Sequence, residues 1–220
     1  MNIKSEQSLN KEIANSITHA IGFVFFLVAN PILILYTFKN GTYVNVLAAT
    51  IFDFTLIFTY LSSTLYHAMQ ESKTKYVLRI FDHLSIFFLI GGSYTALIQF
   101  YLWDERGQFL LFIMWVLIFI GTILKIFFTG KYDFISTVFY ILLGCMAIFY
   151  IKTLNELMTT TTFNLLIIGG LSYLLGVIFY AWKKFTYHHA IWHLFVMGGS
   201  VCHFLSITLS AVEYLGNGKN

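Results

Sequence analysis

The 220-residue chain is 58% hydrophobic, 19% aromatic and only 10% charged, whereas a soluble domain carries about 25% charged residues. This composition excludes an ordinary soluble domain and indicates a protein that crosses a membrane several times. The formal net charge of +3 is too small to suggest binding to nucleic acid. Membrane lipids are therefore the partners that we expect, with no nucleic-acid partner.

Seven apolar stretches follow one another along the chain, and each can span about 30 Å of hydrocarbon, which takes roughly 20 helical residues. They do not alternate between polar and apolar residues, so they do not fit a membrane β-barrel. The predicted spans are Ile13–Phe38, Val44–Tyr66, Ile80–Tyr101, Phe109–Phe128, Phe134–Ile151, Phe163–Trp182 and Ala190–Tyr214. Because the connections are short, the sequence predicts an all-α membrane protein, a seven-transmembrane-helix bundle in a single domain over residues 1–220.

Lysine and arginine residues divide unevenly between the two sets of connections, and this division predicts the orientation in the membrane. The larger set comprises Lys4, Lys11, Lys73, Lys75, Arg79, Lys125, Lys131, Lys183 and Lys184. The smaller set comprises Lys39, Arg106, Lys152 and Lys219. Since cytoplasmic connections carry the excess, we expect a multi-pass protein of the cell membrane with a cytoplasmic N-terminus and an extracytoplasmic C-terminus.

Two histidines, His189 and His193, stand at the beginning of the last span. Residues four apart on a helix lie one above the other on the same face, so this pair can bind one metal ion together. The alternative is a pair of histidines at the membrane interface that binds no metal. The positions of the other polar residues favour the metal.

Further polar residues are predicted at the same depth in the membrane as this pair. His67 closes the second span and Asp82 opens the third, so both lie on the predicted cytoplasmic side. Three imidazoles with an open fourth position form the ligand set of a catalytic zinc site. The sequence therefore predicts a Zn²⁺ site made of His67, His189 and His193. His19, near the cytoplasmic start of the first span, is expected to support this site from behind the ligands.

Two residues beside the predicted ligands are candidates for catalysis. Ser63 precedes His67 by one helical turn, so its hydroxyl can hold a water molecule or hydrogen-bond to the histidine. Asp82 is expected to hold the water and act as a general base, although a carboxylate at the start of a helix is also stabilised by the helix dipole. His83 faces about 100° away from Asp82 and is a weaker ligand. His188 lies off the face of the 189/193 pair.

Three short motifs on seven spans resemble a known family. They are Ser63-Thr64-Leu65-Tyr66-His67, Phe81-Asp82-His83 and His189-Ala190-Ile191-Trp192-His193. The chain resembles the hemolysin III group of the progestin and adiponectin receptor (PAQR) family, and Glu12-Ile13-Ala14-Asn15-Ser16-Ile17-Thr18-His19 looks like its bacterial branch. The resemblance implies zinc binding by His67, His189 and His193, with Ser63 and Asp82 in supporting roles. The long N-terminal domain of the animal receptors is absent, so a hormone-receptor role is not expected.

Three functions remain open from the sequence. The resemblance to ceramidase-like relatives implies zinc-dependent hydrolysis of a lipid amide, in which the metal makes water more acidic and polarises the carbonyl. A non-enzymatic sensor or regulator of membrane-lipid homeostasis, with a structural zinc, is the second. A membrane-lytic protein is the third, but the charged residues gather at one face instead of lining a pore. An open coordination position distinguishes the enzyme from the sensor.

Overall fold

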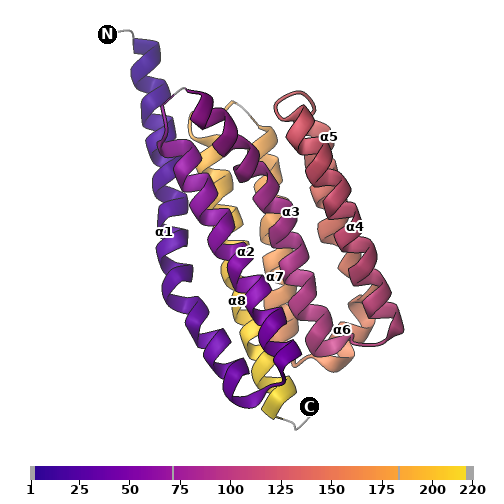
Figure 1. Cartoon of the computed structure of the whole chain (residues 1–220). Coiled ribbons are helices and arrows are strands. Elements are labelled where there is room, and N and C mark those ends of the chain that lie inside the picture. Colours follow the sequence, from indigo (N-terminus) through magenta and orange to yellow (C-terminus); the bar gives the residue numbers. More distant parts are fainter. Residues whose placement is uncertain (1–2, 71, 183, 217–220) are drawn as a thin grey trace.

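The computed structural model describes residues 3–70, 72–182 and 184–216, which form helices and short connections without a strand. The elements are α1 (Ile3–Asn40), α2 (Tyr43–Ala68), α3 (Lys73–Tyr101), α4 (Glu105–Phe128), α5 (Asp133–Gly144), the 3₁₀ helix η1 (Cys145–Tyr150), α6 (Ile151–Leu157), α7 (Thr160–Ala181) and α8 (His188–Gly216). Within this described part, 7 helical stretches are long and apolar enough to cross a membrane. They stand side by side, with the two chain termini at opposite ends (Figure 1). The predicted seven-helix bundle is confirmed, whereas its orientation in the membrane stays a prediction.

Most of the observed helices extend beyond the predicted apolar spans at one end or at both, because polar residues continue the helix. α1, for example, begins at Ile3 and not at Ile13. Four helices begin after a side chain whose oxygen accepts a hydrogen bond from a backbone N–H of the first turn, which fixes the start of the helix. These capping residues are Thr42, Ser72, Asp104 and Thr159. Lys183 and Lys219, which we counted for the orientation, lie outside the described residues.

The fifth span is not the continuous helix that its hydrophobicity predicts. It consists of α5, the 3₁₀ helix η1 and α6. The hydroxyl of Tyr94, on α3, donates to the carbonyl oxygen of Gly144 at 2.9 Å and accepts from the N–H of Ala147 at 2.5 Å. A side chain that inserts into the hydrogen-bond ladder in this way interrupts an α-helix. The interruption therefore comes from a neighbouring helix.

Glycines allow the helices that carry the polar residues to pack closely. A Cβ atom added at Gly169 of α7 would lie 2.2 Å from the ring of His203 and 3.0 Å from the carbonyl oxygen of Gly199, both on α8. A Cβ atom added at Gly92 of α3 would lie 2.3 Å from the Thr55 hydroxyl on α2. The absence of a side chain at Gly169 and Gly92 therefore permits the close approach of α7 to α8 and of α3 to α2.

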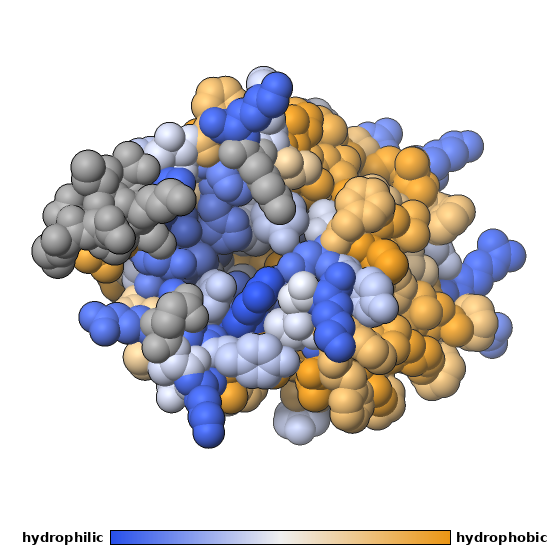
Figure 2. All heavy atoms as spheres, turned by 90° about the horizontal axis from the view of Figure 1, so that it is seen from above, coloured by the Kyte–Doolittle hydropathy of each residue, from blue (hydrophilic) through white to orange (hydrophobic). Residues whose placement is uncertain are grey.

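The N-terminal end of the bundle, where α1 begins, also holds the end of α2, the beginning of α3 and the beginning of α8 (Figure 1). Seen from this end, hydrophilic residues surround a hollow between the helices, and hydrophobic residues cover much of the flank (Figure 2). The fold thus brings the polar ends of four helices together at one membrane surface.

Candidate metal centre

Three histidines meet at the N-terminal end of the bundle. His67 comes from the last turn of α2, and His189 and His193 come from the first two turns of α8. One ring nitrogen from each lies within 4.8 Å of those of the other two. We call these three residues the histidine cluster. It is the one group of this kind in the part of the chain that the structure describes, and it consists of the three residues that the sequence predicted as ligands.

The contacts of His67 determine which of its nitrogens is free. Its Nδ1 lies 2.7 Å from a carboxylate oxygen of Glu12 on α1. Because an ionised carboxylate only accepts hydrogen bonds, Nδ1 carries the proton and Nε2 keeps a free lone pair. The amide nitrogen of Asn15 lies 3.5 Å from the same Nδ1. That nitrogen is itself a donor, so the shorter contact with Glu12 decides the tautomer.

His193 has the same tautomer for a different reason. Its Nδ1 lies 3.1 Å from the backbone carbonyl oxygen of Asn15 and 3.1 Å from the hydroxyl of Thr18. The Thr18 hydroxyl donates its hydrogen to that carbonyl at 2.8 Å, so it is left to accept from His193. Both contacts require a proton on Nδ1, and Nε2 of His193 is again the nitrogen with a free lone pair.

The buried nitrogens of the cluster fit a metal ion. Nε2 of all three histidines is buried and has no hydrogen-bond partner among the described residues. Buried polar atoms are nearly always hydrogen-bonded, so a group of three without partners needs an explanation. Neutral imidazole is the commonest protein ligand of transition metals, and a proton donated from the other ring nitrogen is the usual support of such a ligand. The cluster can therefore hold a divalent ion with three nitrogens.

His19 of α1 lies directly behind the cluster, as predicted. Its ring stacks on that of His193 with 3.7 Å between the ring centroids, and only 2% of the residue is exposed. Neither of its ring nitrogens has a partner within the described residues. His19 thus supports His193 by packing and not by a hydrogen bond.

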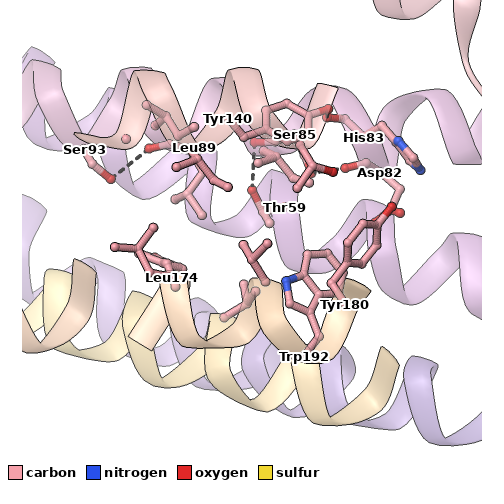
Figure 3. Close-up of a pocket in the computed structure, with 18 of the residues that line it drawn as sticks. Thr59, Asp82, His83, Ser85, Leu89, Ser93, Tyr140, Leu174, Tyr180 and Trp192 are labelled. Carbon is pink, nitrogen blue, oxygen red and sulfur yellow. Dashed lines mark hydrogen bonds between the residues drawn. The ribbon is translucent and has the colours of Figure 1, made fainter. Parts of the chain in front are cut away.

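An apolar cavity of about 240 Å³ adjoins the cluster. It lies among α3, α5, α7 and α8, and both Asp82 and His189 line it (Figure 3). Asp82, His83 and Tyr180 lie toward one end of the close-up, whereas Ser93 of α3 lies toward the other. Ser93 follows Asp82 by 11 positions, which corresponds to about 16 Å of helix. The cavity is therefore elongated, with its charged groups at the end near the cluster.

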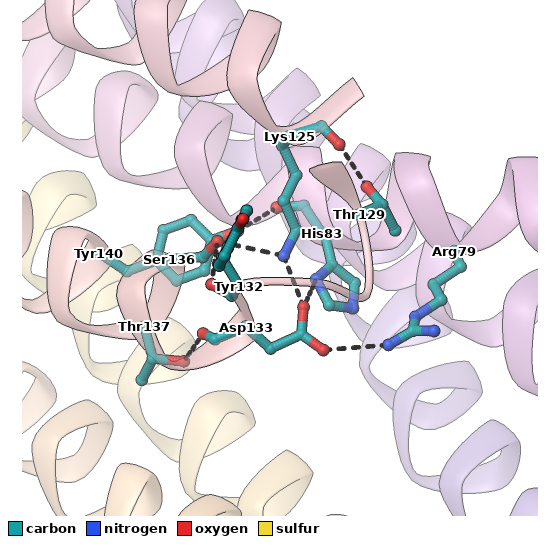
Figure 4. A network of polar contacts seen from close by, with 9 residues as sticks. All are labelled: Arg79, His83, Lys125, Thr129, Tyr132, Asp133, Ser136, Thr137 and Tyr140. Carbon is teal, nitrogen blue, oxygen red and sulfur yellow. Dashed lines mark hydrogen bonds and ion pairs between the residues drawn. The ribbon is translucent and has the colours of Figure 1, made fainter. Parts of the chain in front are cut away.

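Charged side chains form a network at the polar end of this cavity (Figure 4). Asp133, the first residue of α5, lies 2.9 Å from Nζ of Lys125 and 3.0 Å from the guanidinium of Arg79. The His83 ring lies 3.9 Å from the same carboxylate. His83 thus belongs to the Asp133 network and not to the histidine cluster, in agreement with its expected weakness as a ligand. From the sequence, Lys125 and Arg79 were predicted only as charges of the connections, and their partner Asp133 was not predicted.

The two predicted catalytic residues lie in different surroundings, and their roles stay predictions. Ser63 is 1% exposed, one turn before His67, and its hydroxyl has no hydrogen-bond partner in the described ranges. Asp82 is half-buried at the wall of the cavity. His188 contacts the carbonyl oxygen of Phe179 through Nδ1 at 3.2 Å and is outside the cluster, as predicted.

Residues of α1 that support the ligands were missed. Glu12, Asn15 and Thr18 contact His67 or His193, and they are spaced by three residues, which places them on one face of α1. This spacing was the available signal. It was not used because polar residues at the start of a first span are equally typical of a solvated helix end.

Comparisons with known proteins give a consistent result. A family model described as "Haemolysin-III related" matches residues 7–204. The chain is 41% identical over 201 residues to Hemolysin-3 of Bacillus cereus, covering 91% of this chain and 92% of that protein. It is 39% identical over 206 residues to a Hemolysin-3 homolog of Bacillus subtilis (strain 168), covering 94% and 97%. It is 26% identical over 200 residues to the human Monocyte to macrophage differentiation factor, covering 88% and 82%.

Proposed function

The chain belongs to the haemolysin-III-related family of multi-pass membrane proteins, and from this premise we propose that it is a zinc-dependent hydrolase of a lipid amide. The zinc ion is held by the histidine cluster. The substrate is an N-acyl lipid whose acyl chain enters the bundle while its amide stays near the membrane surface.

One observation carries the proposal: three buried Nε2 atoms without partners stand beside an elongated apolar cavity. Three imidazoles leave a fourth position of a tetrahedral zinc open, which is the arrangement of catalytic and not of structural zinc sites. An elongated cavity with a mainly apolar surface and charged groups at one end matches a lipid in shape and polarity. The two features together favour a substrate with a long apolar part and a polar linkage.

The residues around the cluster have roles that follow from their positions. A zinc ion bound by three imidazoles supplies a Lewis acid and makes water acidic enough to react near neutral pH. Asp82 lines the same cavity as His189, so its carboxylate can accept a proton from the attacking water and return it to the leaving amine. The unpartnered hydroxyl of Ser63, one turn before His67, can hydrogen-bond to the water or to the imidazole. The apolar wall excludes bulk water from the acyl chain.

The orientation is part of the proposal. The excess of lysine and arginine at the N-terminal end of the bundle favours a cytoplasmic location for this end and for the histidine cluster. The amide of a lipid in the inner leaflet lies at the same depth as a site near the end of α2 and the beginning of α8. The substrate is therefore drawn from the cytoplasmic leaflet.

The name Hemolysin-3, which the Bacillus relatives carry, raises membrane lysis as a second candidate. A lytic pore requires a polar lining across the membrane. The surface of the cavity in this bundle is mainly apolar, and its charged groups, Asp82, Lys125 and Asp133, lie at one end. These features favour a lipid-binding cavity over a conducting pore.

The test is release of fatty acid from a panel of N-acyl lipids by the purified protein in vesicles. Release should require zinc, stop when a chelator strips the metal and return when zinc is added. Zinc binding without release from any lipid of the panel would support instead a lipid sensor or regulator in which zinc is structural. Lysis of the vesicles without hydrolysis would support the lytic role.

A further inference from the structure

Glu12 connects α1 to the histidine cluster through a contact that is distant in sequence. Its carboxylate lies 2.7 Å from Nδ1 of His67 on α2 and 3.4 Å from Nζ of Lys75 on α3. The Lys75 side chain is 7% exposed, and its Nζ donates to the carbonyl oxygen of Met69 at 3.0 Å. A buried ammonium therefore keeps the Glu12 carboxylate at the ring of His67.

The position of this carboxylate decides how His67 meets a metal. An imidazole can offer Nε2 as a ligand only when the proton is on Nδ1 and the ring points in the right direction. A carboxylate that accepts the Nδ1 hydrogen fixes both and strengthens the imidazole as a ligand. Carboxylate, imidazole and metal in a row are a recurrent arrangement in zinc proteins. At His193, a backbone carbonyl and a hydroxyl accept the Nδ1 hydrogen. Among the described contacts of the histidine cluster, Glu12 is therefore the one charged group that accepts a hydrogen bond from an Nδ1 atom.

We propose that Glu12 is a positioning residue of the metal centre: its carboxylate, held by Lys75, fixes the His67 tautomer and so sets the affinity for the metal. This inference rests on the metal-binding part of the proposed function and does not depend on hydrolysis. It assigns to α1 a direct part in metal binding, although α1 contributes no ligand to the cluster.

The substitution Glu12→Gln separates this role from simple packing between α1 and α2. Glutamine has nearly the same size but no charge, and its NH₂ group can face Nδ1, which favours the tautomer with a proton on Nε2. That tautomer cannot bind the metal through Nε2. Loss of such a support typically lowers metal affinity by about 10–100-fold, and Glu12→Ala should fall in the same range or below.

Glu213→Gln is the matched control. Glu213 lies on α8 at the opposite end of the bundle, and its carboxylate accepts hydrogen bonds from Tyr101, Thr159 and Thr162. Like Glu12→Gln, this substitution removes a carboxylate that contacts residues of other parts of the bundle. It should affect the stability of the metal-free protein as much as Glu12→Gln does, and should leave metal affinity unchanged.

The experiment measures zinc affinity of the full chain in detergent, by competition with a chelator, beside the unfolding temperature of the metal-free forms. The visible spectrum of the Co²⁺-loaded proteins reports the ligand geometry. We expect Glu12→Gln to lower the zinc affinity by about 10–100-fold and to alter the Co²⁺ spectrum. The Glu213→Gln protein should have the zinc affinity and the Co²⁺ spectrum of the wild type.

Two results would overturn the inference and leave the zinc site intact: wild-type affinity and spectrum in Glu12→Gln, or an equal loss of affinity in both variants. A wild-type protein that binds no zinc overturns the inference and the proposed function together. A wild-type protein that binds zinc and hydrolyses no lipid removes only the hydrolase, and the Glu12 measurements then still decide the inference.

Discussion

Alanine at Gly169 and alanine at Gly170 should change the stability of the protein in opposite directions. The two glycines are neighbours on α7, so each substitution gains about the same helix propensity, close to 1 kcal/mol. Their surroundings differ. An added Cβ atom at Gly169 would lie 2.2 Å from the His203 ring and 3.0 Å from the backbone oxygen of Gly199, whereas at Gly170 it would meet no atom of the described residues within 4 Å beyond its chain neighbours and the backbone of its own helix.

The magnitude follows from the backbone contact. The ring of His203 can move, but the carbonyl of Gly199 moves only if α7 and α8 separate. Overpacking of this kind costs about 1–3 kcal/mol, so the two variants should differ by that amount. For a chain of this size, 1 kcal/mol shifts the unfolding temperature by about 2–4 °C, which predicts a difference of roughly 2–12 °C.

Thermal unfolding of the two variants and the wild type in the same detergent is the assay. Gly170→Ala should unfold at or above the wild-type temperature, and Gly169→Ala below it. Equal unfolding temperatures, or a more stable Gly169→Ala variant, would refute the close approach of α7 and α8. That approach matters because α8 carries two of the three cluster histidines.

Two further predictions concern the metal and the topology. The wild-type protein should carry about one zinc per chain. Alanine at any residue of the histidine cluster should remove most of the zinc, whereas the control variants His83→Ala and His188→Ala should keep it. Full zinc content in all three cluster variants would contradict the site. Reporter fusions at Lys73 should read as cytoplasmic and fusions at Asn220 as extracytoplasmic, because lysine and arginine gather on the side of the N-terminus; the reverse pattern would invert the proposed orientation.

The seven spans were predictable because hydrocarbon imposes a length on every apolar helix, and no tertiary information is needed to count such stretches. The break in the fifth span was not. It depends on the hydroxyl of Tyr94, which takes the carbonyl of Gly144 and the N–H of Ala147 out of the α-helical ladder. A tyrosine 50 residues away gives no local signal of this contact.

The histidine cluster was predictable for a similar reason. His67, His189 and His193 stand at helix ends that the order of the spans places on the same side of the bundle. The residues of α1 and α3 that support this cluster were not predicted. Glu12 acts on His67 only because α1 packs against α2 in one particular rotation and height, and Lys75 reaches Glu12 from α3. Rotation about a helix axis is set by packing, which the hydropathy of a span does not contain.

The most direct test of the central claim compares fatty-acid release by the wild type, Asp82→Asn and His189→Ala in zinc-loaded vesicles with N-acyl lipids. Asparagine keeps nearly the shape of aspartate but cannot act as the base, so Asp82→Asn should bind zinc and fail in turnover, whereas His189→Ala should lose both. No release by the wild type from any substrate, or equal release by the wild type and Asp82→Asn, would contradict a zinc hydrolase of this design.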